Sequence, residues 1–85
     1  MQKFSYVIKD EVGIHARPAG LLVKEAKKYE STVKIVKDSK SAEATKLMAV
    51  MGLGVKCGDT VEVVVEGADE DAAFEGIKAF FESNL

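Results

Sequence analysis

The only histidine of the chain, His15, stands three residues before its only proline, Pro18, in the stretch GIHARPAG of residues 13–20. An imidazole nitrogen can act as a nucleophile and hold a transferred group covalently. Arg17, two residues further on, carries a planar and permanently charged guanidinium that suits phosphate. These residue types at this spacing favour phosphoryl chemistry on His15, with Arg17 beside it.

A helix that starts at this stretch would supply further phosphate donors. Proline is tolerated in a first helical turn because its missing N–H has no partner there in any case. The free N–H groups and the dipole of a helix start both favour negative charge. We therefore expect the backbone near Ala16 and Arg17 to face a phosphoryl group on His15. Gly13 and Gly20 allow close approach before the helix and on it.

The residues alone leave other interpretations open. A lone loop histidine is commonly an ordinary solvated residue. A metal site is disfavoured because His15 has no histidine or cysteine companions, and we expect no metal and no cofactor. A nucleophilic pair of Cys57 and His15 stays open, although nothing near Cys57 favours it. The chain has no G-x-x-x-x-G-K-[ST] loop, so we expect no ATP site.

Length and composition indicate one domain over residues 1–85. The chain is 47% hydrophobic and 31% charged, which is ordinary for a soluble globular protein. No apolar run approaches the roughly 20 residues of a membrane span, so we expect no direct membrane insertion. The first residues lack the pattern of a signal peptide, and a single cysteine fits a reducing compartment. We therefore expect a cytoplasmic protein.

The net charge of −2 hides an asymmetry along the chain. Residues 1–58 contain eleven basic and six acidic side chains, whereas residues 59–85 contain one basic and eight acidic. The basic side chains are too dispersed for a nucleic-acid footprint, so no nucleic-acid partner is expected. The basic excess suits docking onto an acidic protein surface instead.

The hydrophobic periodicity predicts seven elements in the order β-α-β-β-α-β-α. Apolar residues alternate over 3–9, and the period becomes helical from Ala16 to Lys28 or Tyr29. Strands are predicted over 31–37, 41–44 and 60–67, with a brief helix over 46–54. A last helix begins at Asp69, a residue type suited to capping it. The order favours an α+β fold in which helices cover one face of a four-stranded, mostly antiparallel sheet.

The brief helix is apolar around its whole circumference, in LMAVMGL of residues 47–53. A helix of about two turns on a sheet cannot bury every side. If Val50 and Leu53 face the core, Leu47 and Met51 share a face near solvent. The pattern is equally compatible with methionines that fill gaps in the core.

GIHARPAG and the later LMAVMGLGV of residues 47–55 resemble the histidine-containing phosphocarrier (HPr) family of the bacterial sugar phosphotransferase system, over essentially the whole chain. The resemblance implies an open-faced sandwich, a four-stranded antiparallel sheet with three helices on one face. It implies that His15 accepts a phosphoryl group on Nδ1 from Enzyme I, charged by phosphoenolpyruvate, and gives it to sugar-specific acceptor components. Arg17 matches the arginine beside the active histidine. The chain would then be a carrier, not an enzyme, and we expect a monomer.

The resemblance also bears on docking and regulation. It places Gly20, Leu47, Met48 and Met51 on the surface that meets partners. In many Gram-positive members, a serine at the start of the short helix is phosphorylated by an ATP-dependent kinase. Lys46 occupies that position here. Thr45 would be a poor substitute, because one residue turns a helix by about 100°.

Two other functions remain as alternatives. The first is a carrier in a regulatory phosphorelay, with the same His15 chemistry but acceptors that control metabolism. The second is a small ligand-binding or structural module in which His15 is incidental. The phosphorylated donor that charges the protein distinguishes the first, and absence of acid-labile phosphate would favour the second.

Overall fold

A computed structural model of the chain describes residues 1–11, 13–14 and 16–85. Val12 and His15 lie outside the described residues. The elements are β1 (Gln2–Val7), α1 (Ala16–Ala26), β2 (Thr32–Lys37), β3 (Lys40–Glu43), α2 (Leu47–Gly52), β4 (Thr60–Glu66) and α3 (Glu70–Asn84). None of the helices in these ranges is long and apolar enough to cross a membrane.

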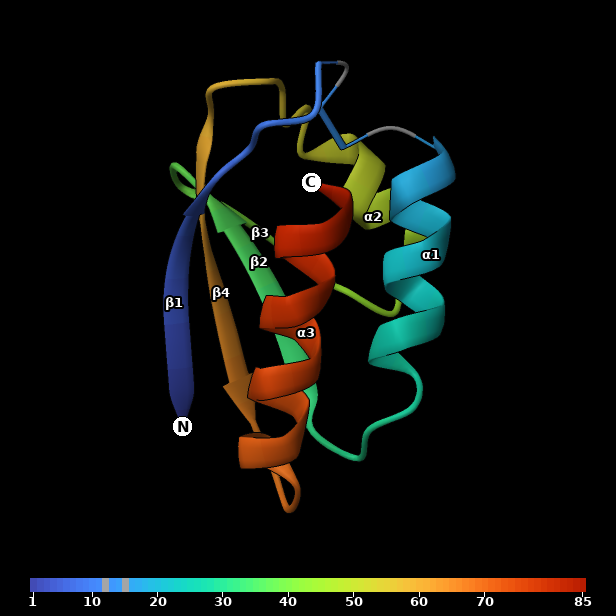
Figure 1. Cartoon of the computed structure of the whole chain (residues 1–85), viewed down its shortest axis with the longest axis vertical. Helices are drawn as coiled ribbons and strands as arrows, with labels where there is room; N and C mark the ends of the chain where they lie inside the picture. The colour runs from blue at the N-terminus through green and yellow to red at the C-terminus, as the bar shows by residue number, and fades with distance from the viewer. Residues whose placement is uncertain (12, 15) are drawn as a thin grey trace.

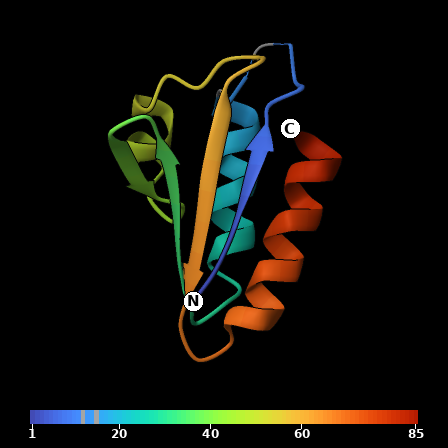
Figure 2. The same ribbon diagram turned by 90° about the vertical axis from the view of Figure 1, so that its left-hand side faces the viewer.

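The four strands form one antiparallel sheet in the order β1-β4-β2-β3. In the register of the central strands, Val63 of β4 lies opposite Phe4 of β1 on one side and Ile35 of β2 on the other. The helices cover one face of the sheet and leave the other face open (Figures 1 and 2). The predicted α+β class, open-faced sandwich and element order are confirmed.

The core lies between the covered face of the sheet and the helices. Along β4, Val61, Val63 and Val65 are buried, while alternate residues face the open side. Each helix turns one stripe inward, and α1 and α3 pack against each other. The buried helical residues are Pro18, Ala19, Leu22 and Ala26 of α1, Val50 of α2, and Ala73, Ile77 and Phe81 of α3.

Several element boundaries differ from those predicted. β1 ends at Val7, two residues before the expected end, and α2 covers Leu47–Gly52 within the expected 46–54. α1 ends at Ala26, before the expected Lys28 or Tyr29, because the chain tightens into i→i+3 bonds there. The N–H of Tyr29 donates to the Ala26 carbonyl at 3.3 Å, and the Tyr29 hydroxyl donates to Glu25 at 3.0 Å. β3 begins and ends one residue earlier than expected, at Lys40 and Glu43.

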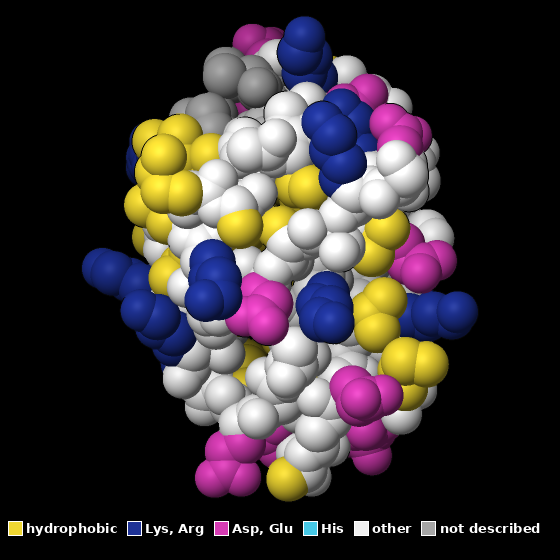
Figure 3. Space-filling view, turned by 180° about the vertical axis from the view of Figure 1, so that it is seen from behind, with side chains coloured by type: hydrophobic (Ala, Val, Ile, Leu, Met, Phe, Trp, Pro, Cys, Tyr) yellow, Lys and Arg dark blue, Asp and Glu magenta, His cyan; other side chains and the backbone are white. Residues whose placement is uncertain are grey.

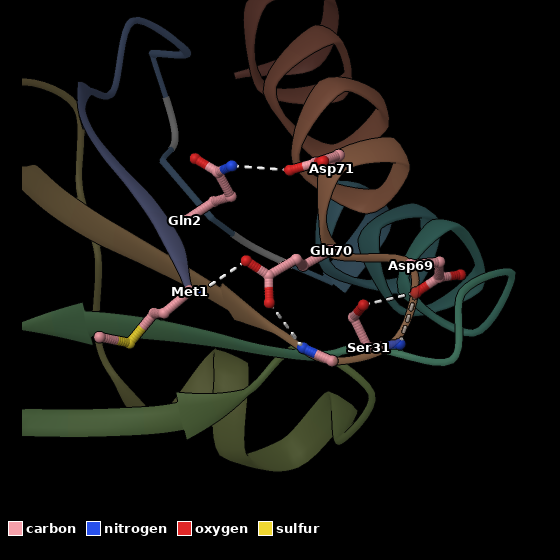
Figure 4. Close-up of polar contacts among 7 residues, drawn as sticks. Met1, Gln2, Ser31, Asp69, Glu70 and Asp71 are labelled. Atoms are coloured by element: carbon pink, nitrogen blue, oxygen red, sulfur yellow. Dashed lines mark hydrogen bonds and ion pairs between the residues drawn. The ribbon is translucent and has the colours of Figure 1, made fainter.

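A network of polar contacts closes the end of the molecule where β4 turns into α3 (Figure 4). The Asp69 carboxylate accepts hydrogen bonds from the N–H of Glu30 at 3.0 Å and from the N–H of Ser31 at 2.9 Å, and also from the Ser31 hydroxyl. Glu70 pairs with the amino group of Met1 at 2.6 Å. We call Met1, Gln2, Glu30, Ser31 and residues 69–71 the closed end.

Asp69 occupies the N-cap position of α3, as predicted, but its side chain makes no cap hydrogen bond. The expectation that the Asp69 side chain caps the helix is therefore wrong, because the side chain bonds none of the first N–H groups of α3. Ser31 is buried, and its donors lie next to the carboxylate, so Asp69 joins the start of β2 to the start of α3 instead. A sequence pattern identifies a residue type that suits a helix cap, but it does not contain the partners that are distant in the sequence and bind the side chain instead.

Candidate functional site

The start of α1 has the properties of an anion-binding turn. α1 begins at Ala16, Pro18 is buried in its first turn, and Ala16 and Arg17 are exposed. The N–H groups of a first turn have no acceptor within the helix. This first turn contains no acidic residue, so no carboxylate of the turn competes for its donors. His15 precedes Ala16 directly in the sequence but lies outside the described residues, so its approach to these donors stays a prediction.

Gly13 and Ile14 lie against the segment that follows α2. Gly13 has a φ of +81°, and a Cβ on it would lie 2.6 Å from the Cα of Lys56. Only glycine fits this close approach without strain. The N–H of buried Ile14 donates to the Val55 carbonyl at 3.1 Å. The start of α1 and the end of α2 are therefore linked through the backbone.

A lysine that the sequence analysis did not single out secures that segment. The ammonium of Lys37 donates to the Gly54 carbonyl and pairs with Asp59, each at 3.0 Å. Asp59 also accepts from the N–H of Lys56 at 2.8 Å. The Lys56 N–H, and secondly Lys37, lower the pKa of the Asp59 carboxyl. Nothing in the local pattern identifies Lys37, because its partners lie 17 and 22 positions away in the sequence.

Arg17 borders an open groove of about 240 Å³ where the start of α1 meets the end of α3. The groove is lined by Asp10, Arg17, Pro18, Leu21, Ser83 and Asn84. The end of α3 is held in place because the Leu85 carbonyl accepts from the N–H groups of Lys9 and Asp10, at 2.5 and 2.9 Å. Arg17 is exposed, so its guanidinium is open to an approaching anion.

α2 divides its apolar residues between the core and solvent. Val50 and Leu53 are buried, whereas Leu47, Met48 and Met51 are 39%, 78% and 36% exposed. Of the two interpretations that the pattern left open, the outward-facing one is confirmed. Hydrophobic side chains gather at one edge of the space-filling view, on the side where α1 and α2 lie (upper left in Figure 3).

α1 adds to this apolar surface. Gly20 is half-buried, and nothing lies within 4 Å of the position that a Cβ would take, so the described residues make no close contact there of the kind expected from the sequence. Leu21 is 41% exposed and was missed by the sequence analysis, although it lies off the buried stripe of α1. α1 packs on α2, and α2 lies beside the first part of α1, toward the end of the molecule opposite the β4–α3 turn (Figure 1). We call Arg17, Gly20, Leu21 and residues 46–48 and 51 the open end.

Cys57 is exposed, and its Sγ lies 3.9 Å from the Lys9 carbonyl. The alternative pair of Cys57 and His15 falls partly outside the described residues and is not tested by the structure. Among the described residues there is no group of three or more histidine, cysteine or acidic side chains placed to hold a metal ion.

Comparison with known proteins gives consistent matches over nearly the whole chain. Residues 2–83 match the family profile described as the PTS HPr component phosphorylation site. The phosphocarrier protein HPr of Mycoplasma genitalium is 44% identical over 99% of this chain and 97% of its own length. A solved mycoplasma histidine-containing phosphocarrier protein is 38% identical with a TM-score of 0.93, covering 96% of this chain and 93% of that one.

The HPr of Thermoanaerobacter tengcongensis matches in two structures, each 38% identical and each covering 98% of this chain. One, described as HPr-C-His, has a TM-score of 0.92 and is covered over 93% of its length. The other, described as a dimer, has a TM-score of 0.77 and is covered over 95%. Because a similar protein forms a dimer, the expectation of a monomer stays a prediction.

Proposed function

Because this chain belongs to the HPr family of phosphocarrier proteins, we propose that it accepts a phosphoryl group on His15 from phosphorylated Enzyme I and passes it to sugar-specific acceptor components. Family membership supports the coarser role of a phosphocarrier in the phosphotransferase system. The observation that carries the finer proposal is the exposed first turn of α1. This turn contains Arg17 and free backbone N–H groups, and His15 directly precedes it in the sequence.

The proposed step is a displacement at phosphorus. Nδ1 of the His15 ring attacks the phosphorus, and an N–P bond forms as the bond from phosphorus to the donor group breaks. The Arg17 guanidinium and the N–H groups of Ala16 and Arg17 offset the charge of the phosphoryl oxygens. Transfer to the acceptor repeats the displacement with His15 as the leaving group.

The strength of this anion site suits a group that must be passed on. A helix start contributes about 0.3–1 kcal/mol to a nearby negative charge, and up to about 2 kcal/mol when partly buried. Such a term orients the phosphoryl group and steadies it without trapping it. The groove beside Arg17 leaves the same site accessible to a second protein.

Docking is assigned to the open end. Leu47, Met48 and Met51 offer an exposed apolar surface, and the methionines can adapt to more than one partner. Gly20 adds a position with free space above its backbone. In this proposal the protein is a substrate of Enzyme I, works in the cytoplasm, and catalyses no turnover of its own.

The decisive experiment incubates the protein with Enzyme I and labelled phosphoenolpyruvate. Wild type should acquire one acid-labile phosphate, and His15→Ala should acquire none. Cys57→Ser is the matched control and should be labelled like wild type, because the thiol has no part in the proposed step. Label on the His15→Ala variant, or no label on wild type, overturns the proposal.

The docking assignment has its own measurement. Addition of Enzyme I to isotopically labelled protein should shift the amide resonances of residues 47–51 together with those of 15–21. Shifts confined to residues 69–85 would place docking on α3 and contradict the assignment to the open end.

A further inference from the structure

The backbone at the start of α2 has the conformation of a capped helix, but the N-cap side chain makes no capping hydrogen bond. Lys46, the N-cap residue, has φ −113° and ψ 101°, and its carbonyl accepts the first helical bond from Val50 at 3.0 Å. This is the extended conformation in which serine, threonine, asparagine or aspartate bonds a free N–H of the first turn. The Lys46 side chain makes no such bond.

Lysine is an unfavourable residue at this position for two reasons. Its ammonium has no acceptor to offer the free N–H groups, and it places a positive charge at the positive end of the helix dipole. α2 has only six residues, too few to be stable without help from caps and packing. Among the described residues, no hydrogen bond or ion pair uses the Lys46 ammonium, so no polar contact of the fold offsets this cost.

The surroundings of Lys46 indicate what could use the charge. Its side chain is exposed and adjoins Leu47 and Met48, so a cation stands at the margin of the apolar surface of α2. Arg17 and Lys24 are exposed on the neighbouring α1. Side chains of lysine and arginine lie around the hydrophobic cluster on this side of the molecule (Figure 3). A protein surface with carboxylates flanking an apolar centre would complement this arrangement.

We infer that Lys46 is a docking contact for a carboxylate on an acidic protein partner, retained at the expense of the stability of α2. The inference rests on the proposed function, because the partner is the phosphoryl donor that meets the open end. Lys46 is then a specificity residue. It steers and holds the complex and does not touch the transferred group.

Three substitutions separate the charge from the cap. Lys46→Gln removes the charge and supplies no good cap, Lys46→Ser removes the charge and supplies a cap, and Lys46→Arg keeps the charge. With Enzyme I and phosphoenolpyruvate at low ionic strength, Lys46→Gln and Lys46→Ser should each raise the KM for the carrier about two- to fivefold. This factor corresponds to the free energy of an exposed ion pair. The kcat should stay near that of wild type, and Arg should restore the KM. The KM difference should shrink at about 0.5 M salt, where the charges are screened.

Melting temperature gives the second readout. Of the three variants, only Lys46→Ser should melt about 4–8 °C higher than wild type, because it supplies the missing cap.

Lys78→Gln is the matched control for the KM, since it removes one exposed positive charge from α3 and should leave the KM unchanged. If wild type is phosphorylated but Lys46→Gln keeps the wild-type KM, this inference alone is overturned. Wild type that accepts no phosphate overturns the proposed function, and this inference with it.

Discussion

The closed end and the open end of this molecule use their charged side chains in opposite ways. At the closed end, the acidic residues that begin α3 are bonded within the fold, Asp69 to the 30–31 segment and Glu70 to the amino group of Met1. At the open end, Arg17, Met48 and Lys46 face solvent. One end uses polar groups to hold elements together, and the other leaves them available to a partner.

This division follows from what each task requires. A bonded carboxylate stabilises the fold but is neutralised by its partners, so it has little left to offer another molecule. A docking surface must stay unsatisfied until the partner arrives, and it therefore contributes little to folding or even opposes it. The molecule is 33 Å long, so substitutions at the two ends should act independently.

The largest expected effect is at the open end. Arg17→Glu should slow phosphoryl transfer from Enzyme I about 10²-fold, the order of loss when one donor to a developing oxyanion is removed, because the new carboxylate also repels the phosphoryl group. The free energy of unfolding should change by only about 0.5 kcal/mol, since the side chain is exposed. Single-turnover labelling and chemical denaturation measure the two quantities.

Lys78→Glu provides the control for that variant. It makes the same change in net charge at an exposed position on α3, outside the open end, and transfer should remain close to wild type. If Arg17→Glu transfers at the wild-type rate, or loses activity only because it unfolds, the separation of the two ends fails.

The mirror-image experiment is at the closed end. Asp69→Ala should lower the melting temperature by roughly 5 °C, because the buried Ser31 donors lose their acceptor. Phosphoryl transfer below the melting transition should be unchanged. Asp71→Ala is the matched control, since Asp71 is exposed and, among the described residues, its carboxylate accepts only from the Gln2 side chain at 2.7 Å. A transfer defect in folded Asp69→Ala would show that the ends are coupled.

Acid should weaken the closed end. The hydrogen bond from the Ser31 hydroxyl, followed by the Glu30 N–H, lowers the pKa of Asp69, and the bond from the terminal amine lowers the pKa of Glu70. Because these pKa values are lower in the folded state than in the unfolded state, the stabilisation is fully present above the ordinary carboxyl pKa of about 4. It is lost as the pH falls through the folded-state values.

Thermal melting between pH 6 and pH 2 measures this dependence. The melting temperature of wild type should decline below about pH 4, and that of Asp69→Ala should decline less, because one of the responsible carboxyl groups is gone. Equal slopes in the two proteins would mean that other carboxyl groups account for the acid sensitivity.

Several elements of the fold could be predicted from the sequence because they have a clear hydrophobic period. The valines of β4 alternate, and the stripe of α1 repeats every three or four residues, so both elements were placed within a few residues. Whether Met51 is buried or exposed could be decided only from the packing of α2 in the structure, because α2 is apolar on every side. The roles of Lys37 and Asp69 depend on partners distant in the sequence, and no local pattern contains them.

The candidate site divides in the same way. The His-x-Arg-Pro motif consists of neighbouring residues, so the sequence favours phosphoryl chemistry there, and the resemblance to the HPr family decided between this interpretation and the alternatives. The exposed Leu21 and the backbone link from Ile14 to Val55 come from packing. His15 lies outside the described residues, so its orientation remains a prediction from the sequence.

The smallest expected effect sharpens the comparison within the open end itself. We expect this protein to lack the serine-type regulatory phosphorylation, because the matching position holds Lys46, whose ammonium cannot accept phosphate as a seryl hydroxyl does. Thr45 offers a hydroxyl one residue earlier, but it lies before the N-cap of α2 and is half-buried. Incubation with an ATP-dependent HPr kinase, followed by mass spectrometry of the peptide spanning residues 39–56, should detect no phosphate. Lys46→Ser should gain one, since it restores a hydroxyl at the N-cap. Stoichiometric phosphate on Thr45 of wild type would show that the kinase reaches past the N-cap, and that the open end carries a switch as well as a docking surface.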